Sequence, residues 1–169
     1  GDIYFYHTKQ DKFTALNAFN DLKNIPIYSF LEDSGNNLWF ATDIGLHMYN
    51  PKSGKSLVYT TENSDLPDDL IRTIAEDSEQ NIWVGTLAGG LCVFDRDFKL
   101  LRNLGQSHDF FAVNHIYKDS KNRMWIASQN DLFLFNSIHT DSIMRLGKLS
   151  GLAGADIRSI VEGKTADEI

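Results

Sequence analysis

NSDLPDDLIRTIAEDSEQNIWVGTLAGGLCVFD, residues Asn63–Asp95, is the stretch that decides the fold, because the chain repeats it. Ile27–Pro51 (IYSFLEDSGNNLWFATDIGLHMYNP) and Val113–Asn136 (VNHIYKDSKNRMWIASQNDLFLFN) are imperfect copies, and Ile157–Glu162 begins a further one. Each copy alternates short apolar runs with turn-forming residues, which predicts short strands rather than helices.

Three tryptophans mark the period of the repeat. Trp39 and Trp83 are 44 residues apart, and Trp83 and Trp125 are 42 residues apart. A period of this length filled with short strands is typical of a β-propeller, in which each repeat forms a blade of four antiparallel strands. We therefore predict an all-β fold: a partial propeller with three full blades and a split blade at each end.

The repeat divides one expected domain, residues 1–169, into five consecutive pieces. The end of a preceding blade, three full blades and the start of a next blade are expected at 1–24, 25–62, 63–106, 107–148 and 149–169. The two end pieces together lack a second strand, so we expect one chain to close poorly and to leave strand edges open. Open edges invite pairing. We expect self-association or strand exchange through these edges, and a monomer at every concentration in light scattering would contradict it.

A strand and an aspartate-led turn open each copy. The expected first strands are Ile27–Glu32, Ile71–Glu76, Val113–Lys118 and Ile157–Glu162. They carry apolar residues on both faces, as innermost strands packed on both sides do. Asp33, Asp77 and Asp119 follow, each with a serine after it. Such side chains bond turn amides, so we interpret the repeated carboxylate as part of the turn and not as a catalytic or calcium-binding group.

The tryptophans share a second feature: a small residue lies two positions after each. These residues are Ala41, Gly85 and Ala127. Because side chains two positions apart in a strand lie on the same face, each indole has free space beside it, into which a neighbouring blade can pack. The tryptophans are therefore expected to form the core between blades rather than a ligand-stacking site.

Composition excludes several classes of function. The 169 residues carry a formal net charge of −7, which offers no basic surface for nucleic acid. No run of about 20 apolar residues occurs, so membrane contact is expected only through parts outside this sequence. Cys92 is the single cysteine, which excludes an internal disulfide and is interpreted as a core residue. Histidine spacing does not fit a zinc site and no HExxH, phosphate-loop or GxSxG motif occurs, so we predict no metal, cofactor or catalytic residue.

The middle copy carries a family pattern. It has N-x-x-L-P before its first strand, and then I-W-V-G-T-x-x-G-G-L from Ile82 to Leu91. This pattern resembles the two-component regulator propeller repeat, and the resemblance extends over nearly the whole chain. It implies the periplasmic sensor region of a Bacteroides-type hybrid histidine kinase of the inner membrane. The segment would sense a glycan-derived ligand without catalysis of its own, while the parent protein runs a phosphorelay and regulates transcription.

The candidate ligand site lies where the copies differ. The third copy lacks the glycine pair and has Phe110-Phe111 where the pattern has Leu-Pro. Loops before the first strands and turns after the second strands share one face of a propeller, and aromatic rings beside carboxylates and amides suit an oligosaccharide. The candidates on this face are Asp43, Asp65, Asp68, His108, Asp109, Phe110, Phe111, Gln129 and Asn130. His115, on an inner strand beside the central channel, joins them.

Some of these candidates also have a purely structural interpretation. Phe110 and Phe111 could pack at a blade junction, and His115 could be structural, since Ser29 and Thr73 hold its repeat position. Two other functions remain open: a propeller polysaccharide lyase and a protein-binding scaffold. A lyase would need a cluster of His, Arg, Tyr or metal ligands on the channel face, and the repeats offer no unmatched cluster of this kind.

Overall fold

The computed structural model describes residues 3–16, 22, 24–105, 110, 112–136, 143–147, 152 and 156–163. In this part of the chain every strand pairs antiparallel with a neighbour in sequence, giving three four-stranded sheets and one hairpin. The hairpin is β1 (Tyr4–His7) and β2 (Lys12–Ala15). The first sheet is β3 (Ile27–Glu32), β4 (Leu38–Thr42), β5 (Leu46–Asn50) and β6 (Lys55–Tyr59). The second is β7 (Ile71–Glu76), β8 (Ile82–Thr86), β9 (Leu91–Phe94) and β10 (Leu100–Asn103). The third is β11 (Val113–Lys118), β12 (Met124–Ser128), β13 (Leu132–Phe135) and β14 (Ile143–Arg145).

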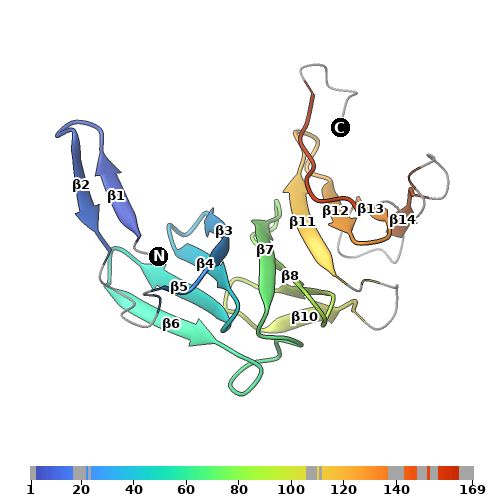
Figure 1. The fold of residues 1–169 in the computed structure, drawn as a ribbon, viewed down its shortest axis with the longest axis horizontal. Coiled ribbons are helices and arrows are strands. Elements are labelled where there is room, and N and C mark those ends of the chain that lie inside the picture. The colour runs from blue at the N-terminus through green and yellow to red at the C-terminus, as the bar shows by residue number, and fades with distance from the viewer. Residues whose placement is uncertain are drawn as a thin grey trace.

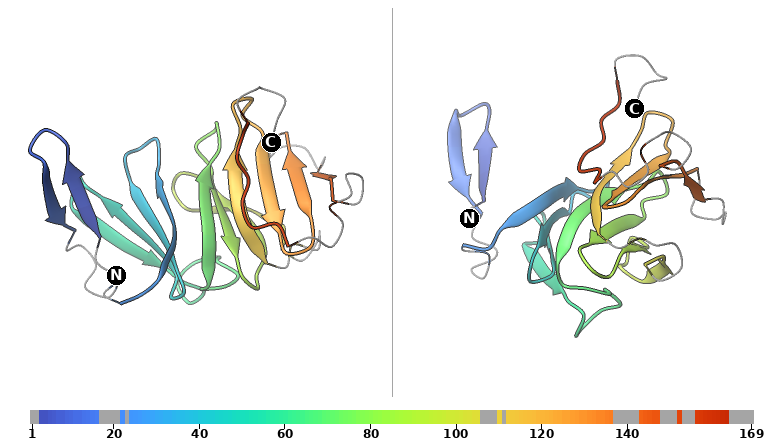
Figure 2. Two further views of the ribbon diagram at one scale, coloured as in Figure 1. Left: turned by 45° about the horizontal axis from the view of Figure 1, so that its top comes forward. Right: turned by 45° about the vertical axis from the view of Figure 1, so that its right-hand side comes forward.

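The sheets follow one another around an arc. Figure 1 shows β3, β7 and β11 on the inside of the arc and β6, β10 and β14 on the outside. In the left view of Figure 2 the sheets stand next to one another in chain order, each presenting a face to the next. These are the blades of a partial β-propeller, so the predicted fold class is confirmed.

The hydrophobic core lies between neighbouring sheets rather than inside any one of them. One buried cluster joins the first blade to the second, and another joins the second to the third. Trp39 stacks on Phe98 of the following blade with 5.5 Å between ring centroids, and Trp83 meets Phe135 edge-on at 5.2 Å. The tryptophans are therefore inter-blade core, as predicted from the small residue that lies two positions after each.

Gly85 shows why a small residue follows each tryptophan. A Cβ added to it would lie 2.5 Å from Cγ1 of Val113, the first residue of the next inner strand. That separation is far inside van der Waals contact. The next blade thus packs directly on the backbone of β8.

A side-chain hydrogen bond joins each inner strand to the next. The Ile74 N–H donates to Oγ of Ser29 at 3.4 Å, and the Ile116 N–H donates to Oγ1 of Thr73 at 3.1 Å. At the third junction the Ile160 N–H donates to Nδ1 of His115 at 3.1 Å. His115 therefore serves as the acceptor that Ser29 and Thr73 provide in the other blades.

Two details differ from the sequence-based expectations. Residues 156–163 form no strand, although Ile157–Glu162 repeats a first-strand sequence; no ladder of backbone hydrogen bonds joins them to another described segment. Phe30 on β3 is 59% exposed, whereas the matching Ile74 and Ile116 are buried. Ile74 and Ile116 each lie against the preceding inner strand, and no described inner strand precedes β3.

Candidate functional site

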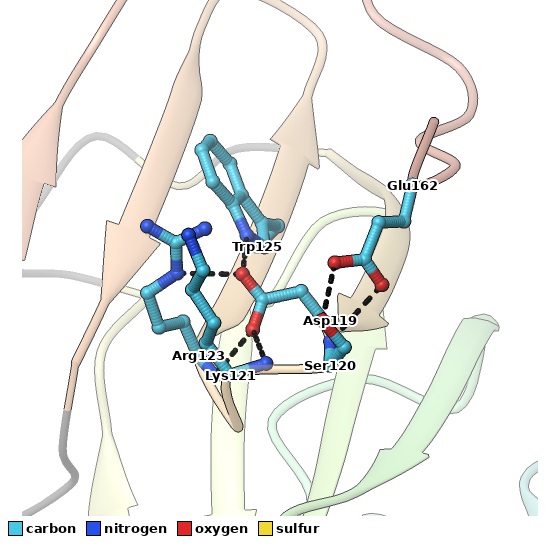
Figure 3. Close-up of polar contacts among 6 residues, drawn as sticks. All are labelled: Asp119, Ser120, Lys121, Arg123, Trp125 and Glu162. Atoms are coloured by element: carbon cyan, nitrogen blue, oxygen red, sulfur yellow. Dashed lines mark hydrogen bonds and ion pairs between the residues drawn. The ribbon is translucent and has the colours of Figure 1, made fainter. Parts of the chain in front are cut away.

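The repeated aspartates are structural. Oδ1 of Asp119 accepts the Lys121 and Arg123 amides at 3.0 and 2.8 Å, while its Oδ2 accepts the indole N–H of Trp125 at 2.8 Å (Figure 3). Asp33 and Asp77 likewise accept one indole and the amides of their turns. Burial acts to raise the Asp119 pKa, but the hydrogen bonds from Trp125 and Arg123 and the Arg123 charge outweigh it and lower the pKa below its ordinary value. Each carboxylate is thus fully engaged in closing a turn and anchoring a tryptophan.

A serine–glutamate pair fastens two of the blade junctions. Ser120 donates its amide and hydroxyl to the Glu162 carboxylate at 3.1 and 2.6 Å (Figure 3). Ser34 does the same to Glu76, 42 residues on, at 2.7–3.1 Å. At the middle junction the repeat places Lys118 in the glutamate position, opposite Ser78. This junction lacks the pair.

One cleft on the molecule collects side chains from several blades. It measures about 380 Å³ and opens where successive inner strands begin. Its walls carry four residues from one repeat position, the second residue of each first-strand sequence: Tyr28, Arg72, Asn114 and Arg158. The other lining residues are Leu87, Ala112, Gln129 and Asp156. A size of a few hundred Å³ and a lining drawn from several repeats suit a small-molecule site.

A β-bulge in each inner strand places these side chains. The pairing register shifts between Ile71 and Thr73, and therefore at Arg72; the same shift occurs at Tyr28 in β3 and Asn114 in β11. A bulge leaves one residue outside the regular ladder and redirects its side chain. The recurrence of the bulge therefore brings equivalent residues of successive blades to one place.

Arg72 lies in the cleft and forms no ion pair with another residue of the described ranges. Its guanidinium lies 5.2 Å from the centroid of the Tyr28 ring, a cation–π arrangement. Its Nε is buried and meets no hydrogen-bond acceptor in the described part of the chain. Because buried polar groups are normally hydrogen-bonded, this N–H is an unused donor.

The opposite side of the cleft is internally bonded. Asn114 donates Nδ2 to Oδ1 of Asp156 and to the Ile157 carbonyl, each at 2.9 Å. Arg158 donates Nε to Oδ2 of Asp156 at 2.9 Å. The described lining residues thus include two arginines and one aspartate, a formal charge of +1 on a chain whose net charge is −7.

Of the predicted ligand residues that the structure describes, Gln129 alone lines this cleft. Asp68 instead accepts the amides of Ala88 and Leu70, at 2.8 and 3.2 Å, and so ties two loops together. Asp65 and Asn130 are exposed elsewhere, and Oδ1 of Asp43 is buried without a hydrogen-bond partner among the described residues. His108, Asp109 and Phe111 lie outside the described residues.

Two predicted residues prove to be structural. Phe110 is 1% exposed and packs on Phe133 with 4.2 Å between ring centroids, so it is a core ring and not a platform for a sugar. His115 is half-buried in the inter-blade hydrogen bond to Ile160 and does not line the cleft. Burial lowers the pKa of His115, which favours the neutral ring that can accept this bond. In both cases the blander interpretation holds.

The sequence-based site missed the bulge residues. Tyr28 and Arg72 each lie between an apolar and a small residue of an inner strand, and Asn114 lies between Val113 and His115. The signal that could have found them is a large polar side chain at the same repeat position in every copy, with its identity changing from copy to copy. Regular alternation does not place that position in a shared cleft; only the bulge does.

Two kinds of reactive group are absent from the described residues, namely metal-binding clusters and a reactive thiol. They contain no group of three or more His, Cys, Asp or Glu side chains able to hold a metal ion. Burial raises the pKa of the Cys92 thiol to about 12, so the thiol is protonated at neutral pH. In the described ranges no helix is long and apolar enough to span a membrane.

Four-stranded antiparallel blades around an arc define the class, a β-propeller segment. Residues 21–43 and 65–88 match the family model of the two component regulator propeller. The chain therefore carries two component regulator propeller repeats, and the match falls on its first two full blades. The expected family resemblance is confirmed.

One of two solved extracellular domains supports the same assignment, and the second, at under 25% identity, shows the same fold. The extracellular domain assigned to the hybrid two component system BT3049 from B. thetaiotaomicron is 32% identical with a TM-score of 0.84, over 98% of this chain and 23% of that one. The extracellular domain assigned to the one component system BT4673 from the same organism is 24% identical with a TM-score of 0.65, over 85% of this chain and 19% of that one. This chain thus spans about a fifth to a quarter of those domains.

More distant likeness concerns the fold alone. Virginiamycin B lyase from Staphylococcus aureus is 17% identical with a TM-score of 0.66, over 85% of this chain and 47% of that one. At this identity the match shows shared propeller architecture and not shared chemistry. The comparison with curated proteins found no match.

Proposed function

We propose that this chain is part of the extracytoplasmic sensor of a two-component signalling protein and acts by binding a ligand, not by catalysis. The observation that carries the proposal is the 32% identity, over 98% of the chain, to the extracellular domain of a hybrid two component system. The family repeat in the first two full blades supports it independently. In such an arrangement the parent protein sits in the inner membrane, the propeller lies in the periplasm, and a phosphorelay leads to regulated transcription.

The ligand we propose is derived from a glycan and occupies the cleft between the bulge residues. Asn114 and Gln129 offer amide groups for hydroxyls, and Tyr28 offers a ring. Binding there bridges three blades, because the cleft side chains come from β3, β7, β11 and the following segment. A ligand that contacts several blades at once binds one arrangement of the blades more tightly than another. It therefore shifts the population toward that arrangement, as signalling requires.

The gene that encodes this chain tests the sensor proposal. We expect the same reading frame to encode a membrane span and a histidine kinase. A reading frame with neither would overturn the sensor role. For the ligand, the intact protein should bind members of a glycan array, and autophosphorylation in membranes should change when those glycans are added; binding to no glycan would remove the glycan part of the proposal and leave the sensor role standing.

A further inference from the structure

We infer that the cleft takes an acidic sugar, and that Arg72 binds its carboxylate or sulfate group. The inference rests on the proposed function, since it specifies the charge of the glycan-derived ligand. It starts from the bulge position, where the second residue of each inner strand turns into a common space. Among the residues at that position, Arg72 is the one whose buried Nε lacks a partner.

The state of Arg72 points to an oxyanion. A buried guanidinium N–H without an acceptor costs free energy, and a guanidinium presents N–H groups in a planar fork that matches two oxygens of a carboxylate or sulfate. The Tyr28 ring, 5.2 Å away, restricts the guanidinium from one side and leaves it in the cleft. The site is thus organised for an anion before one binds.

The carboxylate near Arg72 in the cleft is bonded to other residues and does not neutralise the Arg72 guanidinium. Asp156 is the one carboxylate among the described lining residues, and it is engaged by Asn114 and by Arg158, at 2.9 Å each. These described residues carry a formal charge of +1. On a protein of net charge −7 this makes the cleft a local exception that attracts an anionic ligand.

The rest of the lining fits the body of a sugar. Gln129 and Asn114 are amide side chains able to bond hydroxyls, and Leu87 with Ala112 adds a short apolar wall. The volume of about 380 Å³ is near the lower end of the range for small-molecule sites, which suits one or two sugar rings rather than a polymer.

The test is titration calorimetry on the 169-residue chain with matched pairs of sugars. Digalacturonate is compared with α-1,4-galactobiose, which carries neutral hydroxymethyl groups in place of the carboxylates, and galactose 6-sulfate is compared with galactose. We expect at least one acidic member to bind more tightly than its neutral partner. Arg72→Gln should weaken that binding roughly 10- to 100-fold, and Arg72→Lys should restore it only in part, because the fork is lost.

Arg96→Gln is the control, since it removes one positive charge from an exposed turn outside the cleft. It should leave the affinity unchanged. Tighter binding of the uronate or of the sulfated sugar decides which oxyanion the site takes. Equal binding of acidic and neutral sugars would overturn the inference while leaving the proposed function intact, whereas binding of none would overturn both the inference and the proposed glycan ligand. The comparison of sugars needs no variant, so it decides the question even if Arg72→Gln does not fold.

Discussion

At the scale of single residues, Asp77 could be mistaken for a catalytic carboxylate, but its role is structural. It is buried and accepts the amides of Glu79 and Asn81, at 2.9 Å each, and the indole N–H of Trp83 at 2.8 Å. The aspartate recurs as Asp33 and Asp119 because every blade uses it to close a turn and to anchor a tryptophan, not because the blades share a reaction.

Asp77→Ala should lower the free energy of unfolding by about 2–4 kcal/mol, because it leaves buried donors without an acceptor. Urea denaturation followed by tryptophan fluorescence measures the change. Asp97→Ala, at an exposed aspartate, should change the free energy of unfolding by less than about 0.5 kcal/mol. A loss at Asp77 as small as that at Asp97 would contradict the structural role.

His115 makes one blade junction sensitive to pH. Its Nδ1 accepts the Ile160 N–H only while the ring is unprotonated there, and burial lowers its pKa below 6.5. A lowered pKa means that the unfolded chain binds the proton more readily, so stability falls as the pH drops from about 6.5 to the folded-state pKa. Above that window the contribution is complete.

His115→Ser should reduce this loss between pH 7 and pH 5, because a serine hydroxyl accepts the same bond in the manner of Ser29. Thermal unfolding at a series of pH values gives the comparison. His7→Ser, which removes an exposed histidine from β1, should leave the pH dependence as it is. Identical pH profiles for the wild type and His115→Ser would show that the junction does not titrate.

At the scale of the strand, the contact between β8 and β11 leaves no room for a side chain. Gly85→Ala should destabilise the protein by about 1–3 kcal/mol, since the added Cβ would meet Val113 at 2.5 Å and Thr73 at 2.6 Å. Gly35→Ala is the matched control: Gly35 lies in an exposed turn, and its added Cβ meets nothing closer than 3.2 Å. Differential scanning calorimetry of both variants tests this close packing. A melting temperature of Gly85→Ala equal to that of the wild type would contradict it.

The junction between the second and third blades offers the converse experiment. Lys118→Glu should complete the missing serine–glutamate pair with Ser78 and raise the free energy of unfolding by about 0.5 kcal/mol, or about 1–2 °C in melting temperature. The gain is small because the existing pairs are exposed. Lys12→Glu makes the same charge change on the exposed strand β2, away from any junction. An equal effect of both variants would assign the change to net charge alone.

The sequence predicted buried strands more accurately than exposed ones, because burial requires apolar residues at defined positions. The inner strands have the expected bounds, as in Ile71–Glu76, because apolar residues occur on both faces and an aspartate turn ends each one. The outer strand β10, Leu100–Asn103, alternates half-buried and exposed residues, so no apolar pattern marks its ends.

The site was less predictable, for two physical reasons. Arg72 reaches the cleft through a shift in pairing register, and register is a property of two strands that one strand's pattern does not carry. Phe110 follows the polar sequence Gln-Ser-His-Asp, which suggested a surface ring, yet it packs against Phe133 and Phe135 of a strand over 20 residues later. Gln129 does line the cleft, and its role as a ligand contact stays a prediction.

At the scale of the whole molecule, each blade supplies both an interface and a share of the cleft. Binding and blade packing are therefore coupled through the inner strands, which carry the junction hydrogen bonds and the bulges within one or two residues of each other. The self-association expected from the sequence stays a prediction; the exposed rings of Tyr4, Tyr6 and Phe13 on the β1–β2 hairpin are where a second copy would find apolar surface.

Amide chemical-shift mapping on the ¹⁵N-labelled chain tests the central claim most directly, namely that bulge residues of successive blades form one ligand site. On titration with the tightest-binding acidic sugar, the amides of Tyr28, Arg72, Asn114 and Arg158 should shift together with a single dissociation constant, while those of the outer strands β6 and β10 stay in place. Shifts confined to one blade, or to residues outside the cleft, would contradict the account.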